Sequence, residues 1–197
     1  MEKLVNTLEK CGYRVEVFRK SKEAKEALLR EISVEDSIGI GGSMTILDME
    51  VYKELKDRGN EVYWHWKAED KANAQIKARN AKTYISSVNA ITKDGKIINV
   101  DATGNRVASL IFGHEDVYIV AGKNKICEDY HSAIERIRNV AAPKNAIRLK
   151  LKTPCTRTGK CMDCNSQDRI CNVETIISRN PNGTKIHIYL VDEELGY

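Results

Sequence analysis

Four of the six cysteines of this chain lie in one short stretch near its C-terminal end. They are Cys155, Cys161, Cys164 and Cys171, with the spacing C-x5-C-x2-C-x6-C. Two cysteines separated by two residues can bring both sulfurs to one metal centre, and the flanking cysteines can complete four ligands. Four thiolates suit a closed tetrahedral zinc site or a [4Fe–4S] cluster. The spacing therefore predicts a metal site and leaves zinc, iron–sulfur and unligated reactive thiols as alternatives.

The cysteine spacing matches no single metal-binding pattern. Zinc ribbons usually pair two C-x2-C knuckles, whereas this stretch has one, and bacterial ferredoxin runs follow a different spacing. The N-terminus lacks the apolar core of a signal peptide, so we expect a cytoplasmic protein. In that setting, clustered cysteines indicate a metal site sooner than disulfides. Cys11 and Cys127 stand alone, and we assign them to the core, where free cysteines are common.

A second feature is a glycine turn that follows the apolar stretch 37–40. Gly41 and Gly42 let the backbone approach a ligand closely, and Ser43 and Thr45 add hydroxyl groups at the start of the next helix. A helix start presents free N–H groups and a partial positive charge, which suits a phosphate or carboxylate. The turn is neither a Walker A loop nor Gly-x-Gly-x-x-Gly. It indicates either an anion site or a tight turn with a hydroxyl cap and no ligand.

Small polar residues gather in the segment 86–106, at expected strand ends, where open parallel sheets place their ligands. Asp101 could act as an acid or base, and Arg106 could hold a carboxylate or phosphate through its planar fork, so these are the catalytic candidates. The alternative is that Asp101 and Asn105 cap the next helix while Arg106 is solvated. The further binding candidates, here and in the loop after strand 117–121, are Asn89, Thr103, Gly104, Asn105, Asn124 and Lys125.

The hydrophobic pattern that must position these residues alternates between helical and strand-like spacing. Helices are expected over 4–8, 24–29, 49–55, 68–80, 105–112 and 129–141, the last ending near Pro143. Strands are expected over 13–18, 37–40, 61–66, 83–86, 90–92, 96–100, 117–121, 173–178 and 186–191. This alternation predicts an α/β fold with an open, mainly parallel sheet and helices on both faces.

Two strand pairs should add antiparallel hairpins to that sheet. The first joins 90–92 to 96–100 through Asp94-Gly95, because Asp-Gly supplies the positive φ that a tight turn demands. The second joins 173–178 to 186–191. A chain of 197 residues fits one domain, so residues 1–197 are expected to form a single unit. The cysteine-rich loop at 153–172 is long and aperiodic, and a bound metal would explain its length.

The composition excludes several partner classes. The net charge of +4 is too mild and too dispersed for a nucleic-acid-binding face. No apolar run approaches the roughly 20 residues that a membrane span requires. No serine, histidine and acid stand at the spacing of a known nucleophilic motif. We therefore expect a small anionic metabolite as the partner, with neither nucleic acid nor a membrane span.

Three stretches together resemble the LUD (lactate utilisation) domain family, in its short form with a C-terminal cysteine motif. They are Gly39-Ile-Gly-Gly-Ser-Met-Thr45, Ser87-Val-Asn-Ala-Ile-Thr-Lys-Asp-Gly95 and Asp101-Ala-Thr-Gly-Asn-Arg-Val107. Phe112-Gly113, Val120-Ala-Gly-Lys-Asn-Lys125 and Ala142-Pro-Lys-Asn-Ala146 follow them, so the resemblance covers nearly the whole chain.

The resemblance implies a fold like that of ribose-5-phosphate isomerase and the CoA transferases. It also implies a role in oxidising lactate to pyruvate, within a complex of lactate-utilisation subunits that carry iron–sulfur clusters. This favours a [4Fe–4S] cluster over zinc, beside a pocket in which Arg106 and the helix-start amides hold lactate or pyruvate. Two alternatives remain. One is an isomerase or transferase on a phosphorylated or CoA-linked metabolite, with Asp101 as acid and base; the other is a binding module with a structural zinc site made by the four cysteines.

Overall fold

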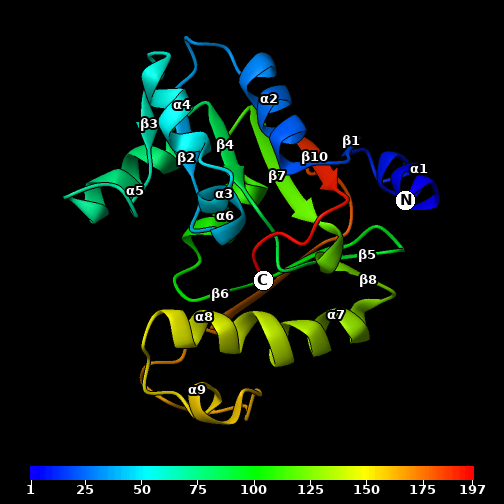
Figure 1. Cartoon of the computed structure of the whole chain (residues 1–197), viewed down its shortest axis with the longest axis vertical. Helices are drawn as coiled ribbons and strands as arrows, with labels where there is room; N and C mark the ends of the chain where they lie inside the picture. Colours follow the sequence, from blue (N-terminus) through cyan, green and yellow to red (C-terminus); the bar gives the residue numbers. More distant parts are fainter.

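The computed structural model describes all 197 residues and is built around a six-stranded, fully parallel sheet. Because every strand runs the same way, all six carboxyl ends lie along one edge of the sheet (Figure 1). The strands, in spatial order, are β1 (Arg14–Phe18), β10 (Lys185–Val191), β7 (Asp116–Gly122), β4 (Thr83–Ser86), β2 (Ile38–Ile40) and β3 (Val62–Tyr63). The prediction of an open, mainly parallel sheet with a central 117–121 strand is confirmed.

This sheet is buried on both faces, as the continuous apolar runs of its inner strands require. Along β7, Val117 and Ile119 pack into one hydrophobic cluster, while Tyr118 and Val120 pack into another on the opposite face. One face is covered by α2 (Ser21–Glu31), α3 (Met44–Asp48) and α4 (Val51–Asp57). The other is covered by α1 (Glu2–Lys10), α6 (Asn105–Ile111) and a second, smaller sheet, with α5 (Lys71–Arg79) packed against β2 and α6.

The smaller sheet is mixed and forms a third layer below the large one. Its strands, in spatial order, are β8 (Ile126–Cys127), β5 (Ala90–Thr92), β6 (Ile97–Asp101) and β9 (Val173–Ile177). The antiparallel hairpin of β5 and β6 is present, with Gly95 at a φ of 90° in its turn. Ile91 and Ile97 point to the core of the large sheet, whereas Ala90 and Ile98 pack on the helix beneath.

The predicted C-terminal hairpin is wrong. Although β9 and β10 are consecutive, β9 pairs with β6 in the small sheet and β10 lies between β1 and β7 in the large one. Alternate side chains of β10 enter the two hydrophobic clusters: Ile186, Ile188 and Leu190 enter one, and Tyr189 and Val191 enter the other. A hairpin partner at the molecular surface could not bury both faces, so the apolar strand takes a central place instead.

A long helix crosses beneath the carboxyl edge of the large sheet (Figure 1). It consists of α7 (Tyr130–Arg136), a π-helical turn η2 (Ile137–Ala141) and α8 (Ala142–Arg148), so the predicted end near Pro143 is wrong. In the π turn the Ala142 N–H bonds to the Ile137 carbonyl, five residues back. The same five-residue spacing would pair Pro143 with the carbonyl of Arg138, but proline has no N–H to donate. The Arg138 carbonyl instead accepts a hydrogen bond from the Cys161 N–H at 3.0 Å.

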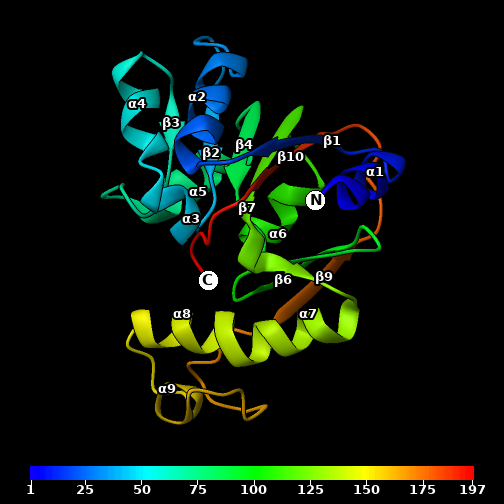
Figure 2. The same ribbon diagram turned by 45° about the vertical axis from the view of Figure 1, so that its right-hand side comes forward.

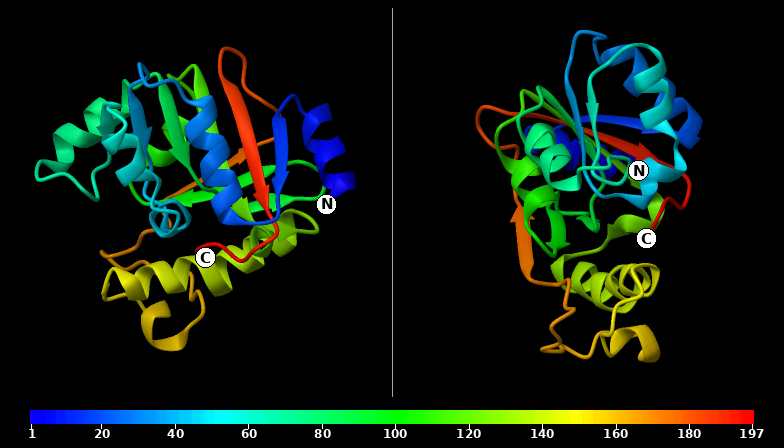
Figure 3. Two further views of the ribbon diagram at one scale, coloured as in Figure 1. Left: turned by 45° about the horizontal axis from the view of Figure 1, so that its top comes forward. Right: turned by 90° about the vertical axis from the view of Figure 1, so that its left-hand side faces the viewer.

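Two further elements are shorter than predicted. The helix expected over 49–55 is interrupted before Val51, because Glu50 adopts a left-handed φ of 55° between α3 and α4. The strand expected over 61–66 is reduced to β3 (Val62–Tyr63), and residues 65–67 form a turn instead. The cysteine-rich loop holds only α9 (Cys155–Thr158) and lies on the far side of α8 from the sheet (Figures 2 and 3).

Candidate functional site

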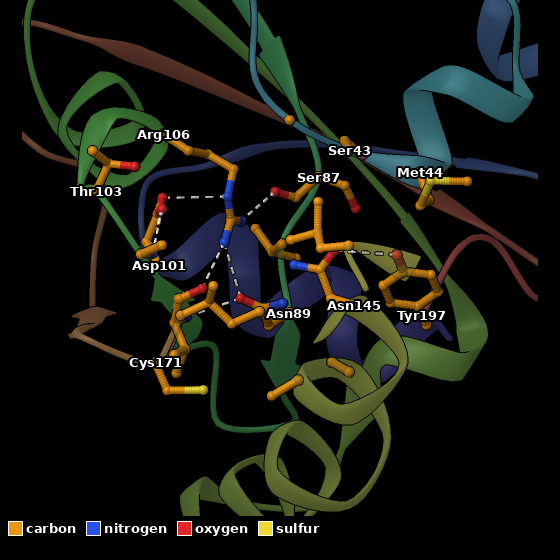
Figure 4. A pocket seen from close by; sticks show the side chains of 18 of the residues that line it. Ser43, Met44, Ser87, Asn89, Asp101, Thr103, Arg106, Asn145, Cys171 and Tyr197 are labelled. Atoms are coloured by element: carbon orange, nitrogen blue, oxygen red, sulfur yellow. Dashed lines mark hydrogen bonds and ion pairs between the residues drawn. The ribbon is translucent and has the colours of Figure 1, made fainter. Parts of the chain in front are cut away.

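A cleft of about 280 Å³ opens between the carboxyl edge of the large sheet and the long helix. Figure 4 shows how side chains from distant segments converge on it. The sequence-predicted residues that line it are Gly42, Ser43, Asn89, Asp101, Thr103, Asn105, Arg106 and Lys125. Gly41, Thr45, Gly104 and Asn124 do not line it. The structure therefore brings most of the predicted candidates to one place, although several serve purposes other than ligand binding.

The glycine turn is explained largely by packing. A Cβ atom on Gly41 would lie 2.6 Å from the Ser86 hydroxyl, and one on Gly42 would lie 3.2 Å from the Trp66 ring. The Ser43 hydroxyl accepts the Ile46 N–H at 3.3 Å and so caps α3, its own helix. With only five residues, α3 offers a weak dipole. These features match the alternative of a capped tight turn.

Arg106 forms the framework of the cleft floor. Its two terminal nitrogens donate to the carbonyls of Ser87 and Val100, at 3.1 and 3.0 Å. They also donate to the side-chain oxygens of Asn99 and Asn89, at 2.6 and 3.0 Å. Burial lowers the pKa of Arg106, an effect that the Asp101 charge opposes. Because its fork is engaged by protein acceptors (Figure 4), Arg106 holds the loops around the cleft together.

Asp101 is similarly occupied. Its carboxylate accepts the Ala102 N–H at 2.7 Å and the Val107 N–H, in the first turn of α6, at 3.3 Å. The Arg106 Nε lies 3.6 Å from the same carboxylate. Asp101 therefore anchors the start of α6 and pairs with the framework arginine. Gly104, the residue before α6, adopts a φ of 86°, which explains a glycine at that position.

Asn124 fixes the C-terminal segment to the site. Its side-chain oxygen accepts the Leu195 N–H at 3.1 Å, and its carbonyl accepts the Arg136 Nε at 2.6 Å. The same arginine donates to the Asn89 carbonyl at 2.7 Å, so the α7 guanidinium ties two loops together. Asn124 thus positions the wall of the cleft without lining it.

Lys125 is a buried lysine in the lining of the cleft. The residue lies in η1 (Lys123–Lys125), directly after β7, and is only 3% exposed. Its Nζ donates to the Thr45 hydroxyl at 3.0 Å and to the Ser87 hydroxyl at 2.8 Å. Burial and the charges of Arg136 and Arg106 lower its pKa to about 7, and Asp48 only partly opposes them.

The cleft wall also contains residues that were not among the predicted site residues. Arg148 stacks over the Trp66 ring, with 4.6 Å from its guanidinium carbon to the ring centroid. Its Nε donates to the Tyr197 hydroxyl at 2.8 Å, and that hydroxyl donates to Asn145 at 3.2 Å. Ser87 also lines the cleft, and its hydroxyl accepts a hydrogen bond from the Lys125 Nζ at 2.8 Å. These side chains come from segments far apart in the chain, so no local spacing connects them.

All four clustered cysteines line one small cavity on the other side of α8. Cys171 lines both this cavity and the cleft, as do Ala142 and Ile170. Burial, and the charges of the other three thiols, raise the pKa of Cys171. In this arrangement no group of three or more His, Cys, Asp or Glu side chains is placed to hold a metal ion. The thiols share a cavity without being drawn together.

Comparison with known proteins gives the family. The model of the LUD domain matches residues 1–191. The crystal structure of a DUF162 family protein from Deinococcus radiodurans, 11% identical, superimposes with a TM-score of 0.54 over 96% of this chain and 94% of that one, a likeness of fold. No curated protein matches the chain. None of the helices is long and apolar enough to cross a membrane. The chain belongs to the LUD domain family, which is associated with lactate utilisation.

Proposed function

We propose that the cleft binds a small 2-hydroxy or 2-oxo monocarboxylate, such as lactate or pyruvate, beside a [4Fe–4S] cluster held by the four cysteines. The observation that carries this proposal is the shared wall: Cys171, Ala142 and Ile170 each border both cavities. A donor set of four thiols and a cationic pocket are thus separated by single side chains.

The charge and size of the cleft support a small anionic ligand. The basic residues Arg106, Arg148 and Lys125 line the cleft, whereas Asp101 is the one acidic residue in its lining. In a low-dielectric site this excess favours an anion. Because the Arg106 donors are engaged by protein acceptors, we assign the Lys125 amine to the ligand carbonyl. A volume of about 280 Å³ is large enough for a small metabolite.

The cysteine cavity supports the cluster by its chemistry. The side chains available to a metal there are four thiols, and the Asp163 N–H already donates to the Cys161 sulfur at 3.4 Å. The Arg169 guanidinium, which donates to the carbonyls of Cys164 and Cys171, would balance part of the negative charge of a thiolate-bound cluster. When bound, the cluster would supply one-electron chemistry next to the cleft. The loop residues would then bring their sulfurs closer together than they are here.

The isomerase or transferase alternative gains no support from Asp101, whose carboxylate is committed to α6 and Arg106. The zinc alternative is separated from the iron–sulfur proposal by metal analysis. Protein purified without oxygen should be brown and contain about four iron atoms and four acid-labile sulfides per chain. A colourless protein with one tightly bound zinc would contradict the cluster.

Ligand binding tests the other half of the proposal. Calorimetric titration of the same preparation should detect pyruvate or lactate and should not detect sugar phosphates or acyl-CoA. A matched variant, Lys123→Met, removes an exposed lysine two residues before Lys125 that pairs with Asp192 at 3.0 Å. It should bind pyruvate like the native chain. Tighter binding of a phosphorylated or CoA-linked compound would contradict the monocarboxylate assignment.

A further inference from the structure

Lys125 is buried beside the cleft although no carboxylate pairs with it. It follows the carboxyl end of the central strand β7, is 3% exposed, and lines the cleft. Its Nζ contacts two hydroxyl groups, those of Thr45 and Ser87, and forms no ion pair with a carboxylate. Buried lysines are normally paired, because burying an unpaired ammonium is costly. A buried lysine with no ion pair in a cleft is therefore a candidate for chemistry at its amine.

The charged groups around this amine favour its neutral form. Arg106 on α6 and Arg136 on α7 repel a positive charge on Nζ, while Asp48 on α3 provides weaker attraction. Together with burial they lower the pKa of Lys125 from 10.5 to about 7. A neutral amine carries the lone pair that a nucleophile needs, and neighbouring cations are an established way to keep it neutral.

We propose that Lys125 is a nucleophile that forms an imine with the carbonyl carbon of a 2-oxo acid bound in the cleft. The substrate class rests on the proposed function. The Nζ lone pair attacks the carbonyl carbon, and the electron pair of the C=O bond moves to oxygen to give a carbinolamine. The carbinolamine then loses water, since both protons of the amine leave with the former carbonyl oxygen. The step requires no oxidant, reductant or second substrate.

The two hydroxyls that hold Nζ are positioned to move these protons. The Ser87 hydroxyl at 2.8 Å and the Thr45 hydroxyl at 3.0 Å can each accept a proton from nitrogen and return one to oxygen. They are positioning residues for the amine. A 2-hydroxy acid has no carbonyl carbon at the same position, so lactate should occupy the same cleft without forming the adduct.

Reductive trapping tests the proposal. The full-length protein, with its metal content as purified, is incubated with pyruvate and sodium cyanoborohydride, digested, and mapped by mass spectrometry. We expect one reduced pyruvate adduct, on Lys125, with the Lys123→Met variant labelled as fully as the native chain. Lys125→Met should lose the adduct, and Ser87→Ala should slow trapping at least several-fold while leaving Lys125 as the labelled residue. The trapping rate should rise with pH through about 7, because the amine must be neutral.

Two outcomes separate this inference from the proposed function. If pyruvate binds by calorimetry and no adduct forms on Lys125 of the native chain, the imine is excluded and the carboxylate-binding function stands. If pyruvate neither binds nor labels, the proposed function fails together with the inference. Labelling spread over exposed lysines, unchanged in Lys125→Met, would also exclude Lys125. Because the labelled site is read from the native chain, the test does not depend on any variant folding.

Discussion

The cleft and the cysteine cavity share a wall but are built in opposite ways. The cleft gathers side chains from the glycine turn, the small sheet, η1, α8 and the C-terminal segment, and its polar groups are already bonded to one another. The cysteine cavity comes mostly from one continuous loop, whose thiols share a space without converging. The polar contacts of the cleft are complete in the folded chain, whereas the four thiols would be drawn together only by the metal that we propose.

Removing the proposed metal ligands should separate metal binding by the cysteine loop from ligand binding in the cleft. Replacing Cys161 and Cys164 by serine should abolish iron and sulfide binding, because two of the four ligands are lost. Pyruvate binding should remain within about threefold of the native value, since the cleft does not depend on the loop for its polar contacts. Metal analysis and calorimetry measure the two effects. The matched variant Cys11→Ser, outside the loop, should retain full iron; loss of iron in both would contradict the ligand assignment.

The framework of the cleft predicts the largest effect on stability. Arg106→Ala should lower the free energy of unfolding by about 3–5 kcal/mol, because it removes the hydrogen bonds to Ser87, Asn89, Asn99 and Val100 together with the ion pair to the half-buried Asp101. Denaturant unfolding measures this loss. Arg30→Ala, at an exposed position on α2, should cost less than about 0.5 kcal/mol. Equal costs for both arginines would show that Arg106 is not the framework residue.

The lowered pKa of Lys125 should make the free energy of unfolding depend on pH. Its folded-state pKa, about 7, lies below the ordinary 10.5, so between these values the unfolded chain binds more protons. The free energy of unfolding should therefore rise with pH over this range, by up to a few kcal/mol at about 1.4 kcal/mol per pKa unit. Below pH 7 both states are protonated and the cost of burying the charge is present in full. The rise should be missing from Lys125→Met and present in Lys123→Met.

The smallest expected effect comes from replacing Pro143, and it concerns the hydrogen bond between the cysteine loop and the long helix. Pro143→Ala supplies an N–H that competes with Cys161 for the Arg138 carbonyl, which would release one main-chain tie of the cysteine loop. We expect a change in stability of about 1 kcal/mol and faster amide hydrogen exchange at Cys161 and its neighbours. Exchange in the cleft segments around Asn89 and Lys125 should not change. Unchanged exchange at Cys161 would contradict the role given to the proline.

Patterns within short segments allowed much of the fold to be predicted. The continuous apolar run of 117–121 and the Asp94-Gly95 turn are visible in neighbouring residues, and both elements are where they were expected. The C-terminal hairpin was wrong because β10 finds its partners far away in the chain, where no local turn signals them. The helix ran past Pro143 because a π turn and the Cys161 N–H relieve the missing bond.

The candidate site also combines features that one segment of sequence reveals with features that appear only after folding. The cysteine spacing is visible in the sequence because all four residues lie in one segment, yet spacing does not say whether the thiols meet. Arg106 was expected to hold a ligand, but its bonds to Asn89, Asn99 and Ser87 exist only after the fold brings these residues together. The lowered pKa of Lys125 depends on burial and on two distant arginines, so no local pattern could indicate it.

The proposed function places an iron–sulfur centre next to a pocket for a small carboxylate. The most direct test is the electron paramagnetic resonance spectrum of anaerobically purified, dithionite-reduced protein, recorded with and without saturating pyruvate. We expect a [4Fe–4S] signal whose shape changes when pyruvate is added, because a ligand in the cleft would lie beside Cys171. Absence of the signal, or a signal that pyruvate leaves unchanged, would contradict it.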